Sequence, residues 1–212
     1  MKSEIEFINH LKCKDYINID DALNFYIKSN KLKIDNMVLA VAGPCENQRI
    51  KFTNNNWGFD QIELSKKFKV KSFLAINDFV AQGLSFADFF NSQNISFSKA
   101  FLDKFNLKLI KKGVPLKNSN LLVTGPGTGL GVCTLTSFNE NIFPITGEGG
   151  NASFSPQNKI EIELLEFLLK EQSYVSFEDL VSGRGLQNIY KFNHFKNKQS
   201  FQNLDASQIG EL

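Results

Sequence analysis

This sequence has few cysteines, little net charge and no long apolar run, and each of these features excludes a class of protein. The 212 residues include only Cys13, Cys45 and Cys133. Three is an odd number, and the wide spacing matches neither a disulfide framework nor a set of metal ligands. We therefore expect reduced thiols in a cytoplasmic protein, and we assign no residue to a metal.

The charge and hydropathy patterns favour neither nucleic acid nor membrane as a partner. The formal net charge is only +2, and the lysines are scattered. One dense basic stretch, Lys191–Lys198, fits a solvated helix face or tail better than a nucleic-acid site. The longest apolar run, Met37–Ala42, is far too short to span a membrane. The first residues hold no apolar segment of the kind found in a signal peptide.

Strand-like and helix-like segments alternate along the chain, which predicts an α/β fold. Met37–Ala42 and Lys71–Ile76 are apolar runs of the kind found in strands buried on both faces. Ile160–Lys170 is the clearest amphipathic helix. A turn-forming junction near Lys112–Pro115 predicts a domain boundary, with one domain at 1–112 and another at 113–212.

Two further expectations concern the ends of the chain. A helix is predicted over Ala22–Lys28, with Asp20 or Asp21 as its N-cap. The polar tail, Asn193–Leu212, is expected to be loosely held.

Glycine is concentrated in one part of the chain. Half of the fourteen glycines lie between Gly125 and Gly150. The apolar run Leu121–Val123 precedes the first of them, and Val132–Thr136 alternates after them, so the segment predicts a β-hairpin with a glycine loop. Dinucleotide and Walker loops lead instead into a helix, and a Walker loop needs a lysine. The loop is either an anion nest for phosphate or a structural turn.

Asn77-Asp78 follows a predicted strand and begins a predicted helix. Ligands of α/β sheets gather at the carboxyl ends of the strands, and the Asp78 carboxylate can take a proton from a hydroxyl. The competing interpretation is that Asp78 only caps the helix.

Two glutamates also allow two interpretations each. Glu148 lies between glycines, where it is either a ligand for hydroxyls or an ordinary turn residue. Glu178 is either a ligand or a first-turn acid that complements a helix dipole. Neither histidine is placed for a nucleophilic triad, and no serine lies in a nucleophile elbow. The set as a whole suits phosphoryl transfer to a sugar-like hydroxyl, which depends on positioning and a proton acceptor.

At these residues the chain resembles the bacterial glucokinases of the actin-like, sugar-kinase superfamily. The resemblance covers essentially residues 4–192, and six motifs occur in family order. They are Ala42-Gly43-Pro44, Thr53-Asn54 with Trp57 and Phe59, Ile76-Asn77-Asp78-Phe79, Gly125–Val132, Gly147–Gly150, and Val181-Ser182-Gly183 with Gly185-Leu186. The resemblance implies a partial ribonuclease H-like (actin-like ATPase) fold, with a small N-terminal domain and the first part of the large domain.

The resemblance also implies roles for particular residues. Asp78 would be the general base for the 6-hydroxyl of glucose, with Asn77, Glu148 and Glu178 on the other hydroxyls. Asn54 lies in the loop that approaches the sugar. Asn151 stands where the family usually has histidine, and it can bind a hydroxyl but cannot become charged. The tip residues Gly127, Thr128 and Gly129 would face the ATP phosphates.

The implied partners are glucose and ATP with Mg²⁺, and the full-length family form allows a homodimer. By the same resemblance, the family's first phosphate loop, Asp-x-Gly-Gly-Thr-Asn, and its C-terminal adenosine-binding portion would lie outside this chain. Two main functions follow: an ATP-dependent glucokinase, or a sugar-binding remnant without catalysis. A ribonuclease-H-like nuclease is a third, and it would need clustered acids and a basic groove.

Overall fold

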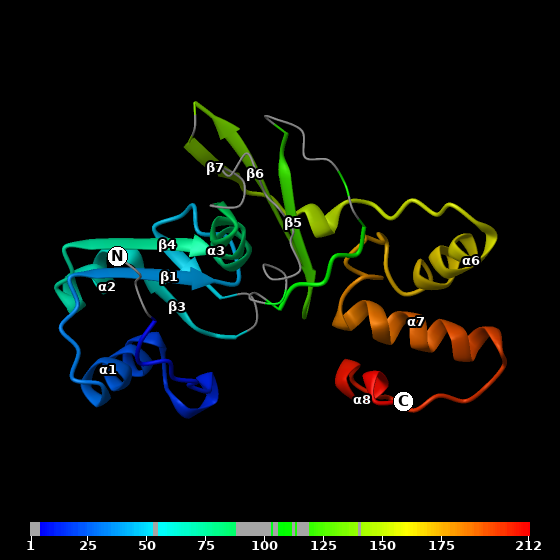
Figure 1. Cartoon of the computed structure of the whole chain (residues 1–212). Helices are drawn as coiled ribbons and strands as arrows, with labels where there is room; N and C mark the ends of the chain where they lie inside the picture. The colour runs from blue at the N-terminus through cyan, green and yellow to red at the C-terminus, as the bar shows by residue number, and fades with distance from the viewer. Residues whose placement is uncertain are drawn as a thin grey trace. The chain divides into compact units, whose positions relative to one another are not determined.

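A computed structural model describes residues 5–52, 55–87, 103, 106–111, 113, 119–139 and 141–212 (Figure 1). The chain divides into two compact units, Met1–Ala81 and Gln82–Leu212. The dividing point lies within the helix α3 (Asp78–Ser85). Of the predicted boundary segment, Lys112, Val114 and Pro115 lie outside the described residues. The domain limits 1–112 and 113–212 therefore stay a prediction.

The first unit is built on two parallel strands. In Figure 1, β1 and β4 lie side by side, with Val41 of β1 opposite Asn77 of β4. A short antiparallel pair, β2 and β3, adds a second small sheet. The elements of this unit before α3 are η1 (Cys13–Asp15), α1 (Ile19–Ser29), β1 (Asn36–Val41), β2 (Arg49–Lys51), β3 (Gly58–Asp60), α2 (Gln61–Phe68) and β4 (Ser72–Asn77).

The core of the first unit joins its helices to both small sheets. Ile50 of β2 and Phe59 of β3 stand opposite each other and are buried. Ile19, Val41, Leu64 and Ala75 complete the buried cluster. Because apolar burial is the main stabilising contribution to folding, this cluster holds the ends of β1 and β4 in place.

Two predictions about this unit are wrong. Val38 and Leu74 stand opposite each other on one face of the β1–β4 pair, and they are 62% and 52% exposed. That face is open within the described part of the chain, because an apolar run predicts burial without supplying the element that covers it. Helix α1 begins earlier than expected: Asn18 is its N-cap, and its Oδ1 accepts from the backbone N–H of Asp21 at 2.9 Å. Burial of Ile19 explains the earlier start.

The second unit combines an antiparallel sheet with helices. Its sheet has the order β5-β6-β7, and α7 contacts both α6 and α8 (Figure 1). A buried cluster of Leu164, Leu168, Val175 and Phe192 joins α6 to α7. The elements are β5 (Leu121–Pro126), β6 (Leu130–Phe138), β7 (Asn141–Ile145), η2 (Gly149–Asn151), α6 (Lys159–Leu168), α7 (Gly183–Lys196) and α8 (Ala206–Gly210).

The C-terminal residues are more ordered than predicted. Helix α7 continues to Lys196, and α8 begins with a capping box formed by Asp205 and Gln208. The side chain of Gln187 on α7 donates to the carbonyl of Leu204 at 2.9 Å. These caps could not be predicted from the polar composition of the segment, because capping depends on single side chains at helix ends. Within the described ranges, no helix is long and apolar enough to cross a membrane.

Leu135 is the best test of the packing of the second unit. It lies on β6 and is 0% exposed, whereas Leu122 on the neighbouring strand β5 is 60% exposed. We expect Leu135→Ala to lower the free energy of unfolding by about 3 kcal/mol, because the substitution leaves a cavity. The matched change Leu122→Ala should cost less than about 1 kcal/mol. Urea unfolding followed by circular dichroism measures both, and equal effects would contradict this packing.

Candidate functional site

In the first unit, the ends of β1 and β4 form a polar edge. The side-chain amide of Asn77 bridges the two strand ends: its Nδ2 donates to the carbonyl of Gly43 at 3.3 Å. Its Oδ1 accepts from the backbone N–H groups of Phe79 at 2.9 Å and Val80 at 3.2 Å. Gly43 has a φ of 145°, a conformation that favours glycine. Asn77 is thus held in one orientation by both strands' ends.

These bonds bear on the two interpretations of Asp78. Asn77 makes the bonds to the second and third following N–H groups that are typical of an N-cap. Asp78 is half-buried, and its Oδ1 accepts only from the neighbouring Phe79 N–H, at 2.9 Å, among the bonds of the described residues. The helix therefore does not need Asp78 as its cap, and the carboxylate is available for another role at this edge.

Cys45 lies near the same edge. Burial raises the pKa of the Cys45 thiol above its ordinary value, and the negative charges of Glu46 and Asp78 raise it further. A carboxylate raises a thiol's pKa only when it is near, since the interaction falls with distance. The bond from Asn77 to the Gly43 carbonyl likewise places the loop after β1 near Asp78.

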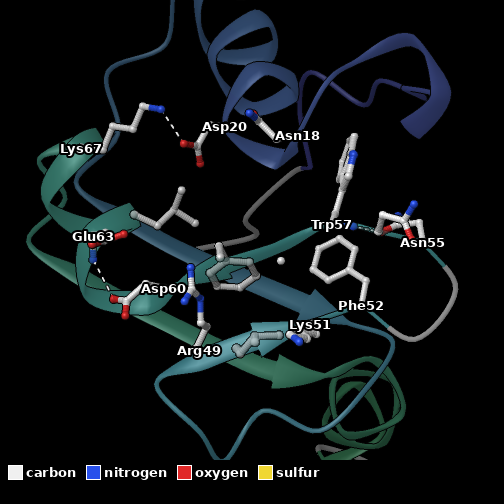
Figure 2. Close-up of a pocket in the computed structure, with 15 residues that line it drawn as sticks. Asn18, Asp20, Arg49, Lys51, Phe52, Asn55, Trp57, Asp60, Glu63 and Lys67 are labelled. Carbon is white, nitrogen blue, oxygen red and sulfur yellow. Dashed lines mark hydrogen bonds and ion pairs between the residues drawn. The ribbon is translucent and has the colours of Figure 1, made fainter.

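The segment predicted to approach the sugar is only partly described. Asn54 lies outside the described residues, but its neighbours Phe52, Asn55 and Trp57 line a cavity of about 830 Å³ (Figure 2). The indole of Trp57 and the ring of Phe52 are 6.1 Å apart, and Asn55 Oδ1 accepts from the Trp57 N–H at 2.7 Å. Small-molecule sites commonly combine aromatic and polar side chains in this way.

Charged side chains surround the rest of this cavity. Figure 2 shows Lys67 of α2 directed at Asp20 of α1, and the two form an ion pair. Asp60 caps α2, and the hydrogen bond from the Glu63 backbone N–H is the main cause of the lowered pKa of the Asp60 carboxyl. These acids are thus engaged in holding α1 and α2.

In the second unit, the predicted glycine hairpin is confirmed. Strands β5 and β6 pair from Leu121 opposite Leu135 to Pro126 opposite Leu130. The strands extend into the glycine sequence, and the tip is reduced to Gly127, Thr128 and Gly129. The Gly127 N–H donates to the Gly129 carbonyl at 2.8 Å, and Thr128 is exposed.

The tip rests on the beginning of α7. The N–H of Gly183 donates to the carbonyl of Gly127 at 2.8 Å. Ser182 caps the helix, since its Oγ accepts from the Gly185 N–H at 3.0 Å. An α-helix N-terminus carries a partial positive charge and unpaired N–H groups, which is why anions bind there. The N–H groups of Gly127, Gly183 and Gly185 are already paired, so what the tip gains from the helix start is its partial positive charge.

The Glu148–Asn151 segment packs against the start of β6. A Cβ at Gly150 would lie 2.3 Å from the carbonyl oxygen of Leu130, so only glycine fits there. The Gly150 carbonyl accepts from the backbone N–H of Glu178 at 2.9 Å. Glu148 and Asn151 are both exposed, and the Tyr174 hydroxyl donates to the Asn151 carbonyl. Glu148, Asn151 and Glu178 therefore lie on segments that are bonded to one another.

Glu178 makes contacts that the sequence did not predict. Its Oε2 accepts from the backbone N–H of Leu130 at 2.8 Å, and its Oε1 accepts from Arg184 Nη2 at 2.9 Å. Glu178 does lie in a single turn, in which Ser176 Oγ accepts from the Asp179 N–H at 3.3 Å and the Val181 N–H donates to the Phe177 carbonyl at 2.8 Å. Its carboxylate, however, bonds to Leu130 and Arg184 and not to the N–H groups of that turn. Arg184 lies inside the Gly183–Gly185 motif, but the motif is defined by its glycines and gives no sign of the charge pairing.

The structure thus groups the predicted residues within each unit. The first unit brings together Asn77 and Asp78. The second brings together the hairpin tip, Glu148, Asn151 and Glu178. Among the described residues, no group of three or more His, Cys, Asp or Glu side chains could hold a metal ion.

The two α/β units, with a polar strand edge and a glycine hairpin, define the actin-like ATPase class that includes the sugar kinases. Solved structures agree. Glucokinase from an Antarctic psychrotroph has a TM-score of 0.68 at 30% identity, over 93% of this chain and 58% of that one. Glucokinase from Balamuthia mandrillaris, solved with glucose, has a TM-score of 0.67 at 24% identity, over 91% of this chain and 56% of that one, and shares the fold.

Sequence comparison gives the family. A family model described as Glucokinase matches residues 1–212, so the chain belongs to the glucokinase family. Glucokinase from Colwellia psychrerythraea is 29% identical over 98% of this chain and 59% of its own length. Glucokinase from Marinobacter nauticus is 33% identical over 89% of this chain and 55% of its own length. The chain spans a little more than half the length of these relatives.

Two glycines of the same motif provide a matched pair for testing the packing on β6. A Cβ at Gly150 would collide with Leu130, whereas a Cβ at Gly147 meets nothing within 4 Å. We expect Gly150→Ala to destabilise the protein by about 2 kcal/mol through overpacking. Gly147→Ala should change stability by less than about 1 kcal/mol. Thermal unfolding of the two variants checks this, and a tolerant Gly150→Ala would refute the close approach.

Thiol alkylation tests the proximity of Asp78 to Cys45. Because the pKa of Cys45 is raised, less thiolate is present at pH 8, and we expect iodoacetamide to modify Cys45 more slowly than the exposed Cys13. Asp78→Asn removes one of the charges that raise this pKa, so Cys45 should then react faster while Cys13 is unchanged. Peptide mass spectrometry over time measures both rates, and an unaltered Cys45 rate would place Asp78 farther away.

Proposed function

We propose that this chain carries out the glucose-binding and phosphoryl-transfer steps of a glucokinase, in which ATP phosphorylates the 6-hydroxyl of glucose. The observation that carries the proposal is that Asn77 and Asp78, at the end of β4, have different roles. Asn77 provides the two hydrogen bonds that cap α3, so Asp78 is not needed for that task. In a chain of the glucokinase family, a carboxylate at this edge that is not needed as a helix cap is suited to general-base catalysis.

Asp78 accepts the proton of the 6-hydroxyl as that oxygen bonds to the terminal phosphorus of ATP. The bond from this phosphorus to the bridging oxygen breaks, and ADP leaves. Removing the proton leaves the oxygen a better nucleophile, and positioning supplies most of the remaining acceleration. The Asn77 amide nitrogen has two N–H donors and gives one to Gly43, so the other can donate to a sugar hydroxyl.

By the family resemblance, further sugar ligands are proposed among the residues of the second unit. Glu178 uses one lone-pair position on each oxygen for Leu130 and Arg184, and a carboxylate has about four such positions in all. It can therefore still accept from hydroxyls. Glu148 and Asn151 are exposed on the segment bonded to Glu178, and they bind hydroxyls in this proposal. Asn54 is included by resemblance alone.

The ATP phosphates lie against Gly127, Thr128 and Gly129 in this proposal. Two features support this placement of the phosphates. Two of the three tip residues are glycines, and the start of α7 lies beside the tip. Mg²⁺ accompanies ATP in the proposal, and among the described residues no group of three or more His, Cys, Asp or Glu side chains could hold it without the phosphates. We derive no step through the metal.

Two finer points belong to the same proposal. The three free cysteines support a cytoplasmic location, since disulfides are rare there. A homodimer is proposed for the full-length family form.

Substitution of Asp78 tests the function directly. We expect Asp78→Ala to lower glucose-dependent ADP formation by about a thousandfold, because the proton acceptor is lost. Glucose binding, measured by calorimetry, should persist in part, because the neighbouring ligands remain. A coupled spectrophotometric assay measures the turnover.

The matched control is Asp35→Ala, which removes an exposed acid of the same unit that pairs with Lys71 at 3.2 Å. It should leave turnover unchanged. Retained turnover in Asp78→Ala would remove Asp78 from the catalytic role. Glucose binding without any turnover in the unaltered chain would replace the kinase proposal with sugar binding alone.

A further inference from the structure

Arg184 lies between two acids that differ in exposure. Its Nη2 is 2.9 Å from Glu178 Oε1 and 3.0 Å from Asp179 Oδ1. The Asp179 side chain is only 9% exposed, whereas that of Glu178 is 24% exposed. One guanidinium thus connects a fixed carboxylate to a more accessible one.

Asp179 is fixed by bonds that are independent of Arg184. Its Oδ2 accepts from both the backbone N–H and the hydroxyl of Ser176, each at 2.8 Å. Ser176 is buried, and its hydroxyl in turn accepts from the Asp179 N–H at 3.3 Å. A buried carboxylate with one oxygen bonded twice in this way is a rigid anchor, because breaking those bonds leaves unpaired polar groups.

Glu178, the second acid bonded to Arg184, also contacts the glycine hairpin. Glu178 Oε2 accepts from the Leu130 N–H at 2.8 Å, directly after the tip. A Cβ at Gly129 would lie 2.5 Å from the same oxygen, so the carboxylate is packed against the hairpin backbone. The helix that carries Arg184 also bonds to the tip through Gly183 and Gly127.

We propose that Arg184 is a positioning residue that holds the Glu178 carboxylate on the hairpin amide of Leu130, so that one side chain joins the sugar site to the phosphate hairpin. The role for glucose rests on the proposed function. The role at the hairpin does not. A charged side chain with only one partner keeps its rotamer freedom, and freezing it on binding reduces affinity. The bond from Arg184 adds a second partner for Glu178 and removes part of that freedom beforehand.

The test uses the whole chain and three substitutions. Arg184→Met removes the charge and keeps a long apolar side chain. Arg184→Lys keeps the charge. Lys196→Met is the matched control, since it removes a cation from the other end of α7 that pairs with Glu163 at 2.7 Å.

The first readout is amide hydrogen exchange at Leu130, followed by NMR, which needs no ligand. We expect Arg184→Met to speed this exchange by about tenfold, because a mobile Glu178 protects the amide less. Arg184→Lys should restore most of the protection, and Lys196→Met should have no effect. Unchanged Leu130 exchange in Arg184→Met would overturn the proposal. General acceleration at every amide would also overturn it, since that indicates a purely structural role.

The second readout is calorimetric glucose affinity. We expect the dissociation constant to rise about fivefold in Arg184→Met and to recover in Arg184→Lys. Faster exchange with an unchanged glucose affinity would overturn the positioning role for the sugar. If the unaltered chain binds no glucose, the proposed function fails for this chain, while the exchange experiment still decides whether Arg184 holds Glu178 on the hairpin.

Discussion

A hydrogen bond from a backbone amide to a carboxylate, Leu130 N–H to Glu178 Oε2, is the contact on which the site of the second unit depends. It requires the hairpin, the glycine-rich segment and the turn before α7 to approach one another at backbone distance. Gly129 and Gly150 permit that approach, because a side chain at either would collide with its neighbour. The density of glycine thus reflects close packing of three segments, in addition to any use of the tip for phosphate.

In the first unit, strand pairing is the constraint that positions the polar residues. Parallel pairing of β1 with β4 places Val41 opposite Asn77, so the residues after both strands share one edge. Asn77 bonds to the loop after β1 and to the start of α3 at once. This double engagement holds Asn77 in one orientation and leaves the adjacent Asp78 without a capping role. In the proposed function, a polar group held in this way could stabilise charge in the transition state without having to rearrange.

Several features of the fold could be predicted from the sequence. The hairpin, the helix from Lys159 and the two apolar strands follow from local periodicity, which depends on neighbouring residues alone. The exposed face at Val38 could not be predicted, since exposure depends on what packs there. The caps at Asn18 and Ser182 were also missed, because several polar residues lie close to each helix start and the structure selects one.

By itself, the sequence determined the order of the motifs, the family they belong to and the residues available for chemistry. It did so because each motif is local: a strand end followed by Asn77-Asp78, or alternating glycines between two strands. Only the tertiary structure decided how those residues are used. Asn77 caps α3 in place of Asp78, and Glu178 bonds to Leu130 and Arg184 in place of serving a helix dipole. Leu130 and Glu178 are 48 positions apart, and such contacts arise from packing that no local pattern encodes.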